Sequence, residues 1–159
     1  MKKLSLVICV YNEELNIAPL SEKIIQSLTD YEYEVIFVDD GSTDATRNNI
    51  LNINDERFVM VQLRKNYGQS SALAAGISVA TGEYIATLDG DLQNDPADIP
   101  MMVQLAEYGD WDLVAGIRSN RKDGLLLRLI PSKIANYLIR LLTKVNIKDY
   151  GCTLKVYRN

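Results

Sequence analysis

The sequence predicts an α/β fold in which a mostly parallel sheet carries helices on both faces. Short apolar segments rich in β-branched residues recur along the chain, as expected for strands that are covered on both sides. Helical patterns separate these segments, and this alternation is typical of parallel strands joined by right-handed crossovers. The length of 159 residues, with 47% hydrophobic and 24% charged residues, fits one globular domain.

The first part of the chain contains two predicted strands, each followed by a predicted helix. Residues 4–10 form an almost wholly apolar run that indicates a central strand. Residues 17–28 keep one helical face apolar. A second strand is predicted over residues 34–38, and Ser42 or Thr43 is expected to cap the helix that follows it.

The next part repeats the same alternation. Residues 58–63 and 84–88 are predicted strands, and the segment between them, residues 68–80, is rich in small residues and predicts a helix packed closely on the sheet. Pro96 is expected near the start of a further helix, and residues 112–116 form the fifth predicted strand.

Polar side chains follow all five predicted strands. Ligands of doubly wound sheets bind at the carboxyl ends of the strands, so these residues should meet at one rim. The rim residues are Tyr11-Asn12-Glu13, Asp39-Asp40, Asn66, Asp89-Gly90-Asp91 and Arg118.

Asp89 and Asp91 form an Asp-x-Asp pair at the end of an apolar strand. Side chains at i and i+2 of a strand share a side, so both carboxylates should point toward one spot. Hard oxygen ligands favour Mg²⁺ or Mn²⁺, and such an ion can neutralise the charge of a departing diphosphate. The alternative is a polar loop with two solvated carboxylates.

Asp39 and Asp40 can accept hydrogen bonds from a ribose hydroxyl or a base N–H, or they can cap the next helix. The chain contains neither a Gly-x-Gly motif nor a phosphate-binding P-loop. A nucleoside diphosphate would therefore be held by metal and cations, for which Arg118, Arg121 and Arg128 are candidates.

The chain has no histidine, which excludes Ser-His-Asp and Cys-His nucleophiles and histidine zinc sites. Cys9 and Cys152 lie far apart in the sequence and indicate a reducing, cytoplasmic compartment.

The net charge of −4 argues against a nucleic-acid partner. However, this value is the sum of −12 over residues 1–117 and +8 over residues 118–159, so the charge is unevenly distributed. Residues 125–145 are basic and amphipathic, and could lie on an anionic membrane or pack on the sheet.

Five motifs, in order along nearly the whole chain, resemble those of family 2 glycosyltransferases. The resemblance is strongest to the polyprenyl-phosphate branch, which includes dolichol-phosphate mannose synthases and undecaprenyl-phosphate sugar transferases. The motifs are VYNE at 10–13, VDDGSTD at 38–44, RKNYGQSSAL at 64–73, TLDGDLQNDP at 87–96 and DYGCTLKVYR at 149–158.

This resemblance implies a GT-A fold and a set of site residues. The residues expected around the nucleotide are Tyr11, Glu13, Val38, Asp39, Asp40, Asp89, Gly90 and Asp91. Those expected to hold Mg²⁺ or Mn²⁺ are Asp89, Asp91 and Gln93. Arg118 would contact the diphosphate or sugar and, with Asp89 and Asp91, serve catalysis, while Arg121, Arg128 and Asp149 would lie on the acceptor side. The family usually has proline in place of Cys9 and often alanine in place of Gly90.

The implied reaction is inverting transfer of a sugar from a nucleotide-sugar, UDP rather than GDP, to polyprenyl phosphate. A lipid phosphate is already anionic, so it needs positioning more than a general base. Transfer to a saccharide hydroxyl and an inactive nucleotide-binding module are the alternatives. A nucleotidyltransferase is disfavoured because the first strand lacks the glycine-rich basic loop of those enzymes.

The resemblance also implies a division of the chain. Residues 1–117 would form the nucleotide-sugar half, and residues 118–159 the start of a basic half that faces acceptor and membrane. A strand is expected to finish at Arg158, and the catalytic domain is expected to be incomplete there. The full-length protein is expected to be cytoplasmic, peripheral or anchored at the cytoplasmic face of the inner membrane.

Overall fold

The computed structural model describes residues 3–117 and 151–159. The chain divides into two compact units, residues 1–114 with 154–159, and residues 115–153. The first unit contains the cleft and the contacts discussed below. Within the described residues, no helix is both long and apolar enough to cross a membrane.

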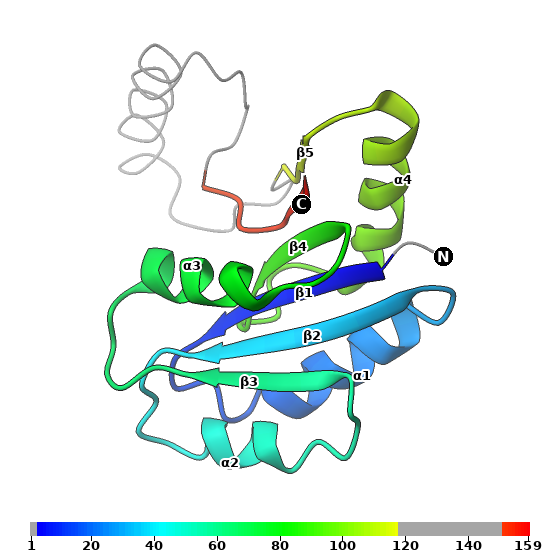
Figure 1. Ribbon diagram of the computed structural model, residues 1–159. Coiled ribbons are helices and arrows are strands. Elements are labelled where there is room, and N and C mark those ends of the chain that lie inside the picture. Colours follow the sequence, from blue (N-terminus) through cyan, green and yellow to red (C-terminus); the bar gives the residue numbers. More distant parts are fainter. Residues whose placement is uncertain (1–2, 118–150) are drawn as a thin grey trace, which may run out of the picture. The chain divides into compact units, whose positions relative to one another are not determined.

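The elements alternate as the sequence predicts, and one further strand follows at the end of the chain (Figure 1). In chain order they are β1 (Lys3–Val10), α1 (Ile17–Ser27), β2 (Glu32–Asp39), α2 (Thr46–Leu51), β3 (Phe58–Gln62), α3 (Gln69–Val79), β4 (Tyr84–Asp89), the 3₁₀ turn η1 (Pro96–Asp98), α4 (Ile99–Gly109), β5 (Leu113–Ala115) and β6 (Lys155–Arg158).

The strands form one sheet in the order β3-β2-β1-β4-β6-β5. β1 pairs in parallel with β2 and β4, and β2 with β3. β6 pairs antiparallel with β4, placing Arg158 opposite Tyr84. The predicted mostly parallel sheet is therefore confirmed. Because Cys9 is opposite Asp89, and Val10 opposite Asp39, three strands finish at the same edge of the sheet.

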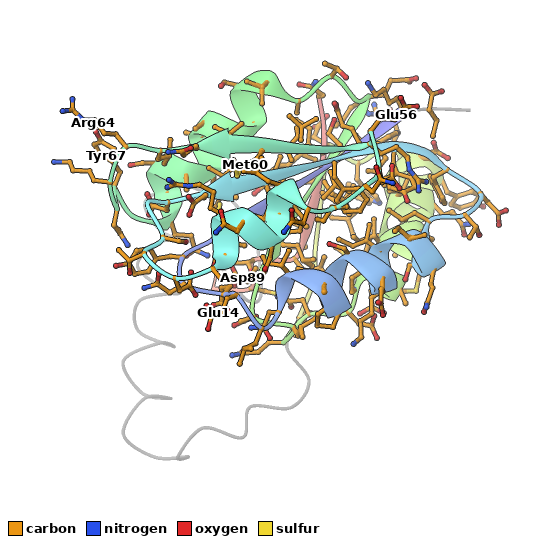
Figure 2. The ribbon with its side chains drawn as sticks, turned by 90° about the horizontal axis from the view of Figure 1, so that it is seen from below. Glu14, Glu56, Met60, Arg64, Tyr67 and Asp89 are labelled. Carbon is orange, nitrogen blue, oxygen red and sulfur yellow. The ribbon has the colours of Figure 1, made fainter. Side chains whose placement is uncertain are left out.

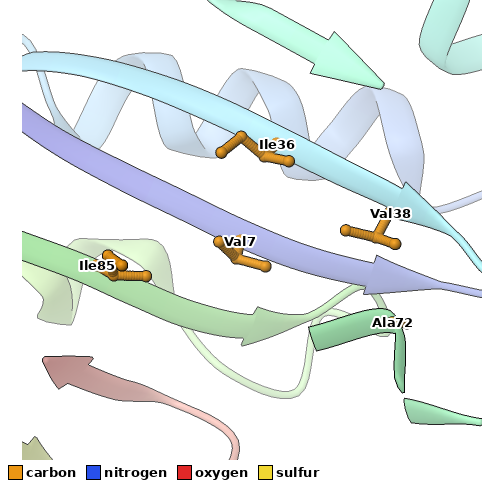
Figure 3. Close-up of a cluster of buried hydrophobic side chains, with 5 residues drawn as sticks. All are labelled: Val7, Ile36, Val38, Ala72 and Ile85. Atoms are coloured by element: carbon orange, nitrogen blue, oxygen red, sulfur yellow. The ribbon is translucent and has the colours of Figure 1, made fainter. Parts of the chain in front are cut away.

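Helices cover both faces of the sheet, with α3 on one side and α1 and α2 on the other (Figure 1). Under α3, Val7, Ile36, Val38 and Ile85 pack with Ala72 in a buried cluster (Figure 3). The apolar stripe predicted for α1 is buried as well, through Ile17, Leu20, Ile24 and Leu28. Burial on both faces explains why the central strands are continuously apolar.

The predicted capping of α2 by Ser42 or Thr43 is wrong. The helix begins at Thr46, after Ala45, without a side-chain cap. Instead, the Ser42 hydroxyl oxygen accepts a hydrogen bond from the Asn12 N–H at 3.0 Å, and the Thr43 N–H donates to the Asn12 side chain at 2.8 Å. The two residues thus join the loops after β1 and β2, while the first N–H of α2, that of Thr46, donates to Asp44 Oδ1 at 3.0 Å.

Asp39, at the end of β2, is completely buried. One of its oxygens accepts a hydrogen bond from the Ser42 N–H at 2.8 Å, and the other accepts from Arg47 Nε and Nη2 at 3.1 and 2.9 Å. A buried carboxylate is tolerated only when it is paired in this way. The Asp39–Arg47 ion pair therefore fixes the turn between β2 and α2.

Replacing Arg47 by methionine should destabilise the fold, because it leaves the Asp39 carboxylate buried with one backbone partner. Since the Arg47 side chain is 35% exposed, we expect a loss in the free energy of unfolding of about 2–3 kcal/mol, near the lower end for a broken buried pair. Urea denaturation measures it, with the exposed Lys23→Met as the matched control. Equal stability of the two variants would contradict the assignment.

Candidate active site

A cleft of about 230 Å³ opens at the carboxyl ends of β1, β2 and β4, next to the amino end of α3. The end of β1 and its loop contribute Cys9, Val10, Tyr11 and Glu13, and the segment after β2 contributes Asp40. The segment that enters α3 and its first turn provide Asn66, Gly68, Gln69 and Ala72. The end of β4 adds Asp89, Gly90 and Asp91. Seven residues of the predicted rim line this cleft: Tyr11, Glu13, Asp40, Asn66, Asp89, Gly90 and Asp91.

The loop after β1 presents Tyr11 and Glu13 to the cleft. Asn12 between them has a positive φ of 56°, a conformation that asparagine tolerates better than most residues. The Glu13 carboxylate accepts a hydrogen bond from the Asn16 amide at 2.5 Å, and the Glu13 N–H donates to the Thr46 hydroxyl at 2.7 Å. These contacts fix Glu13, whereas the Tyr11 side chain is nearly half exposed at the cleft.

Asp40 lines the cleft but is only 4% exposed. Its two oxygens accept hydrogen bonds from the Tyr67 N–H at 2.8 Å and the Gly68 N–H at 2.9 Å. Gly41 has a φ of +78°, and a Cβ there would lie 2.6 Å from the Lys65 carbonyl carbon. Only glycine therefore allows the two loops to approach so closely, and Asp40 holds the segment before α3 in place.

The Asp-x-Asp pair lies at the end of β4 and in the residues that follow it. The Asp89 carboxylate accepts a hydrogen bond from Gln69 Nε2 at 2.6 Å, and the Asp91 carboxylate accepts one from the Gln93 N–H at 3.0 Å. A Cβ on Gly90 would come within 2.6 Å of Val10 Cγ1. A side chain at this position would therefore require Val10 to shift.

Asp89 and Asp91 both line the cleft and carry the oxygen ligands that Mg²⁺ or Mn²⁺ prefers. Within residues 3–117 and 151–159, no group of three or more cysteine, aspartate and glutamate side chains is arranged to hold a metal. Mg²⁺ is commonly bound by one or two carboxylates together with substrate phosphates and water. Two carboxylates from the protein are therefore enough for such a site.

Cys9 brings a thiol into this acidic surface. Burial, together with the negative charges of Asp89 and Asp40, raises the pKa of Cys9 from 9.0 to about 12. The thiol is therefore protonated at neutral pH and acts as a weak donor, at 4.0 Å from the Gln69 carbonyl oxygen. A protonated thiol is a poor nucleophile and a poor metal ligand.

Some predicted site residues lie elsewhere. The Val38 side chain is in the buried cluster under α3, Asp39 pairs with Arg47, and the exposed Gln93 does not line the cleft. Arg118, Arg121, Arg128 and Asp149, and the amphipathic segment 125–145, lie outside the described residues.

Sequence reasoning missed Gln69 as a site residue, although it lies in one of the family motifs. Its side chain lines the cleft and contacts Asp89, 20 residues further along the chain. The available signal was a polar residue at the start of a helix otherwise rich in small residues, after the loop that follows a strand ending at the rim.

A second hollow, of about 430 Å³, lies at the opposite edge, near the amino ends of β2 and β3. Figure 2 shows Glu56 at that end of β3, with Arg64 and Tyr67 at the other end. Two charged residues that line this second hollow have partners within the fold: Arg57 pairs with Asp55, and Glu34 accepts hydrogen bonds from Ser5 and Thr81. These charged groups are used within the fold, so the cleft at the carboxyl edge is the better candidate site.

The fold and the site define the class of protein: a GT-A domain with a carboxylate-rich cleft at the carboxyl ends of its parallel strands. The family model described as "Glycosyl transferase family 2" matches residues 5–159. The chain therefore belongs to glycosyl transferase family 2.

Two curated relatives of this chain are polyprenyl-phosphate sugar transferases by name. A dodecaprenyl-phosphate galacturonate synthase of Rhizobium johnstonii is 49% identical over 166 residues, which cover 98% of this chain and 48% of that protein. An undecaprenyl-phosphate 4-deoxy-4-formamido-L-arabinose transferase of Proteus mirabilis is 43% identical, with 99% and 49% covered. The chain thus spans about half the length of these curated relatives.

Solved structures support the fold. A mannosyltransferase from Pyrobaculum calidifontis in complex with GDP-Man and Mn²⁺ aligns with a TM-score of 0.70 at 22% identity, over 99% of this chain and 44% of that one. Glucosyl-3-phosphoglycerate synthase from Mycobacterium tuberculosis in complex with UDP aligns with a TM-score of 0.71 at 20% identity, over 99% and 57%. At these identities the similarity establishes the fold alone.

The raised pKa of Cys9 predicts slow alkylation. At about pH 8.5 the folded protein should react with iodoacetamide two to three orders of magnitude more slowly at Cys9 than the urea-unfolded chain does. Its rate should keep rising toward pH 12 instead of levelling near pH 9. Mass spectrometry of the Cys9 peptide measures this rate.

Asp89→Asn should lower the pKa of Cys9 and speed its alkylation, because it removes one of the charges that disfavour the thiolate. Asp30→Asn, at an exposed position before β2, is the control and should leave the rate unchanged. A rate that already levels near pH 9 in the unsubstituted protein would show that the thiol is not perturbed.

Proposed function

We propose that this chain forms the nucleotide-sugar-binding part of an inverting glycosyltransferase that moves a sugar to polyprenyl phosphate. The observation that carries the proposal is that Asp89 and Asp91 line one cleft together with Tyr11, Glu13 and Asp40. The 49% and 43% identity to two polyprenyl-phosphate sugar transferases supports the choice of acceptor.

Each cleft residue has a role that its surroundings favour. Asp89 and Asp91 would hold Mg²⁺ or Mn²⁺, and the positive charge of the ion would neutralise the negative charge of the diphosphate. Tyr11, exposed at the cleft, would stack on the base. Glu13 would accept hydrogen bonds from the base or ribose, and Asp40 would do so in addition to its two backbone partners, since each carboxylate oxygen has two acceptor sites.

The remaining predicted residues would act around this core. Val38 and Asp39 would support the nucleotide site through the backbone, because their side chains are buried. Gln93 would join the metal site only if its exposed side chain turned toward the cleft. Arg118, Arg121, Arg128 and Asp149 are proposed for the diphosphate and acceptor side on their motif positions.

The chemistry fits a chain without histidine. An oxygen of the acceptor phosphate would attack the anomeric carbon while the bond from that carbon to the diphosphate oxygen breaks, which inverts the configuration and releases the nucleoside diphosphate. The attacking oxygen is already anionic, so no general base has to remove a proton. The protein contributes alignment of the reactants and screening of charge.

The donor is proposed to be a UDP-sugar rather than a GDP-sugar, because the relatives with 49% and 43% identity are bacterial polyprenyl-phosphate enzymes. Since the acceptor is a lipid, the full-length protein would work at the cytoplasmic face of a membrane. The basic balance of residues 118–159, +8, would favour an anionic lipid surface.

Calorimetric titration with UDP and GDP, with and without Mn²⁺, tests the proposal. We expect Mn²⁺-dependent binding of UDP, and a loss of at least about tenfold in affinity in Asp91→Ala because half of the carboxylate pair is removed. Asp30→Ala, at the opposite edge of the sheet, is the matched control. Absence of nucleotide binding under all conditions, or unchanged binding in Asp91→Ala, would refute the assignment.

A further inference from the structure

Gln69 contacts the Asp-x-Asp pair, but it has no role in the function proposed above. It is the first residue of α3, and its side chain lines the cleft. Its Nε2 donates a hydrogen bond of 2.6 Å to Oδ1 of Asp89 at the end of β4. The residue therefore links a helix start directly to one carboxylate of the Asp-x-Asp pair.

The backbone around Gln69 is fixed from two other strands. The backbone N–H of Gly68, the residue before Gln69, donates a hydrogen bond to the buried Asp40 carboxylate at 2.9 Å. The Gln69 carbonyl oxygen faces the Cys9 thiol at 4.0 Å, and Cys9 is the residue opposite Asp89 in the pairing of β1 with β4. Because Asp40, directly after β2, and Cys9, on β1, both contact this segment, the amide reaches Asp89 from a defined position.

The chemistry of the side chain suits a carboxylate that has to bind a cation. An amide N–H bonded to one carboxylate oxygen restricts rotation of the group, while its neutral charge leaves the carboxylate negative. A lysine at this position would instead neutralise Asp89, and a glutamate would repel it. Hydrogen bonds of this kind orient metal-binding carboxylates in many proteins.

We propose that Gln69 is a positioning residue that holds the Asp89 carboxylate in the orientation that binds the divalent cation with the nucleoside diphosphate. The inference rests on the proposed function, since it assigns a role within the same cleft. Gln69 is exposed and has no part in the buried cluster under α3, so its side chain adds little to the stability of the fold.

The affinity for Mn²⁺ in the presence of UDP, measured by electron paramagnetic resonance, tests this role in Gln69→Met. Methionine has a similar length but no N–H donor. We expect about 10- to 100-fold weaker Mn²⁺ binding, with the urea midpoint unchanged. Gln26→Met, an exposed position on α1, is the matched control and should bind Mn²⁺ like the unsubstituted protein.

The outcomes separate the two proposals. If the unsubstituted protein binds no Mn²⁺ with UDP, the proposed function fails. If it binds and Gln69→Met binds equally well, only the role of Gln69 is overturned.

The side-chain amide resonance of Gln69 gives a test that does not depend on the folding of a Gln69 variant. Addition of Mg²⁺ and UDP to the unsubstituted protein should leave this resonance at its hydrogen-bonded position, whereas Asp89→Asn, which weakens the acceptor, should move it. A shift to the position of a free amide when Mg²⁺ and UDP bind would show that the contact breaks in the loaded site, and would overturn the proposal.

Discussion

Two adjacent buried carboxylates at the end of β2 organise the edge of the sheet that carries the cleft. Burial of a carboxylate is unfavourable unless hydrogen bonds and charge compensate it. Asp39 obtains this compensation from Ser42 and Arg47 on the α2 side, and Asp40 obtains it from Tyr67 and Gly68 on the α3 side. Because Asp39 ends β2 and Asp40 follows it directly in the chain, the loops on both faces of the sheet are tied to the same point.

This arrangement separates the groups that build the cleft from those that face a ligand. Asp39 and Asp40 are buried and hold the loops, whereas Asp89 and Asp91 lie at the cleft surface, where a cation and a diphosphate can reach them. The loop after β1 joins the same framework through Asn12. In the proposed function, a cation would meet an Asp89 carboxylate that Gln69 already holds, which lowers the cost of ordering it.

The sequence alone predicted the strands well, because apolar runs such as residues 4–10 directly reflect burial on both faces. It also predicted that the Asp-x-Asp pair lies at the carboxyl edge, since parallel strands share that edge. It failed where a distant partner decides the outcome. Ser42 bonds to Asn12 instead of capping α2, and the antiparallel direction of β6 depends on its pairing with β4. The contact of Gln69 with Asp89 is likewise absent from any local pattern.

Paramagnetic broadening of the backbone amide spectrum by Mn²⁺ with UDP tests most directly the central claim, that a metal–nucleotide complex binds at the carboxyl edge. The amides of Tyr11, Gly68 and Asp91 should broaden first, while those of Glu32 and Val59, at the amino ends of their strands, should stay sharp. Broadening centred on Glu32 and Val59, or no selective broadening at any Mn²⁺ and UDP concentration, would contradict the claim.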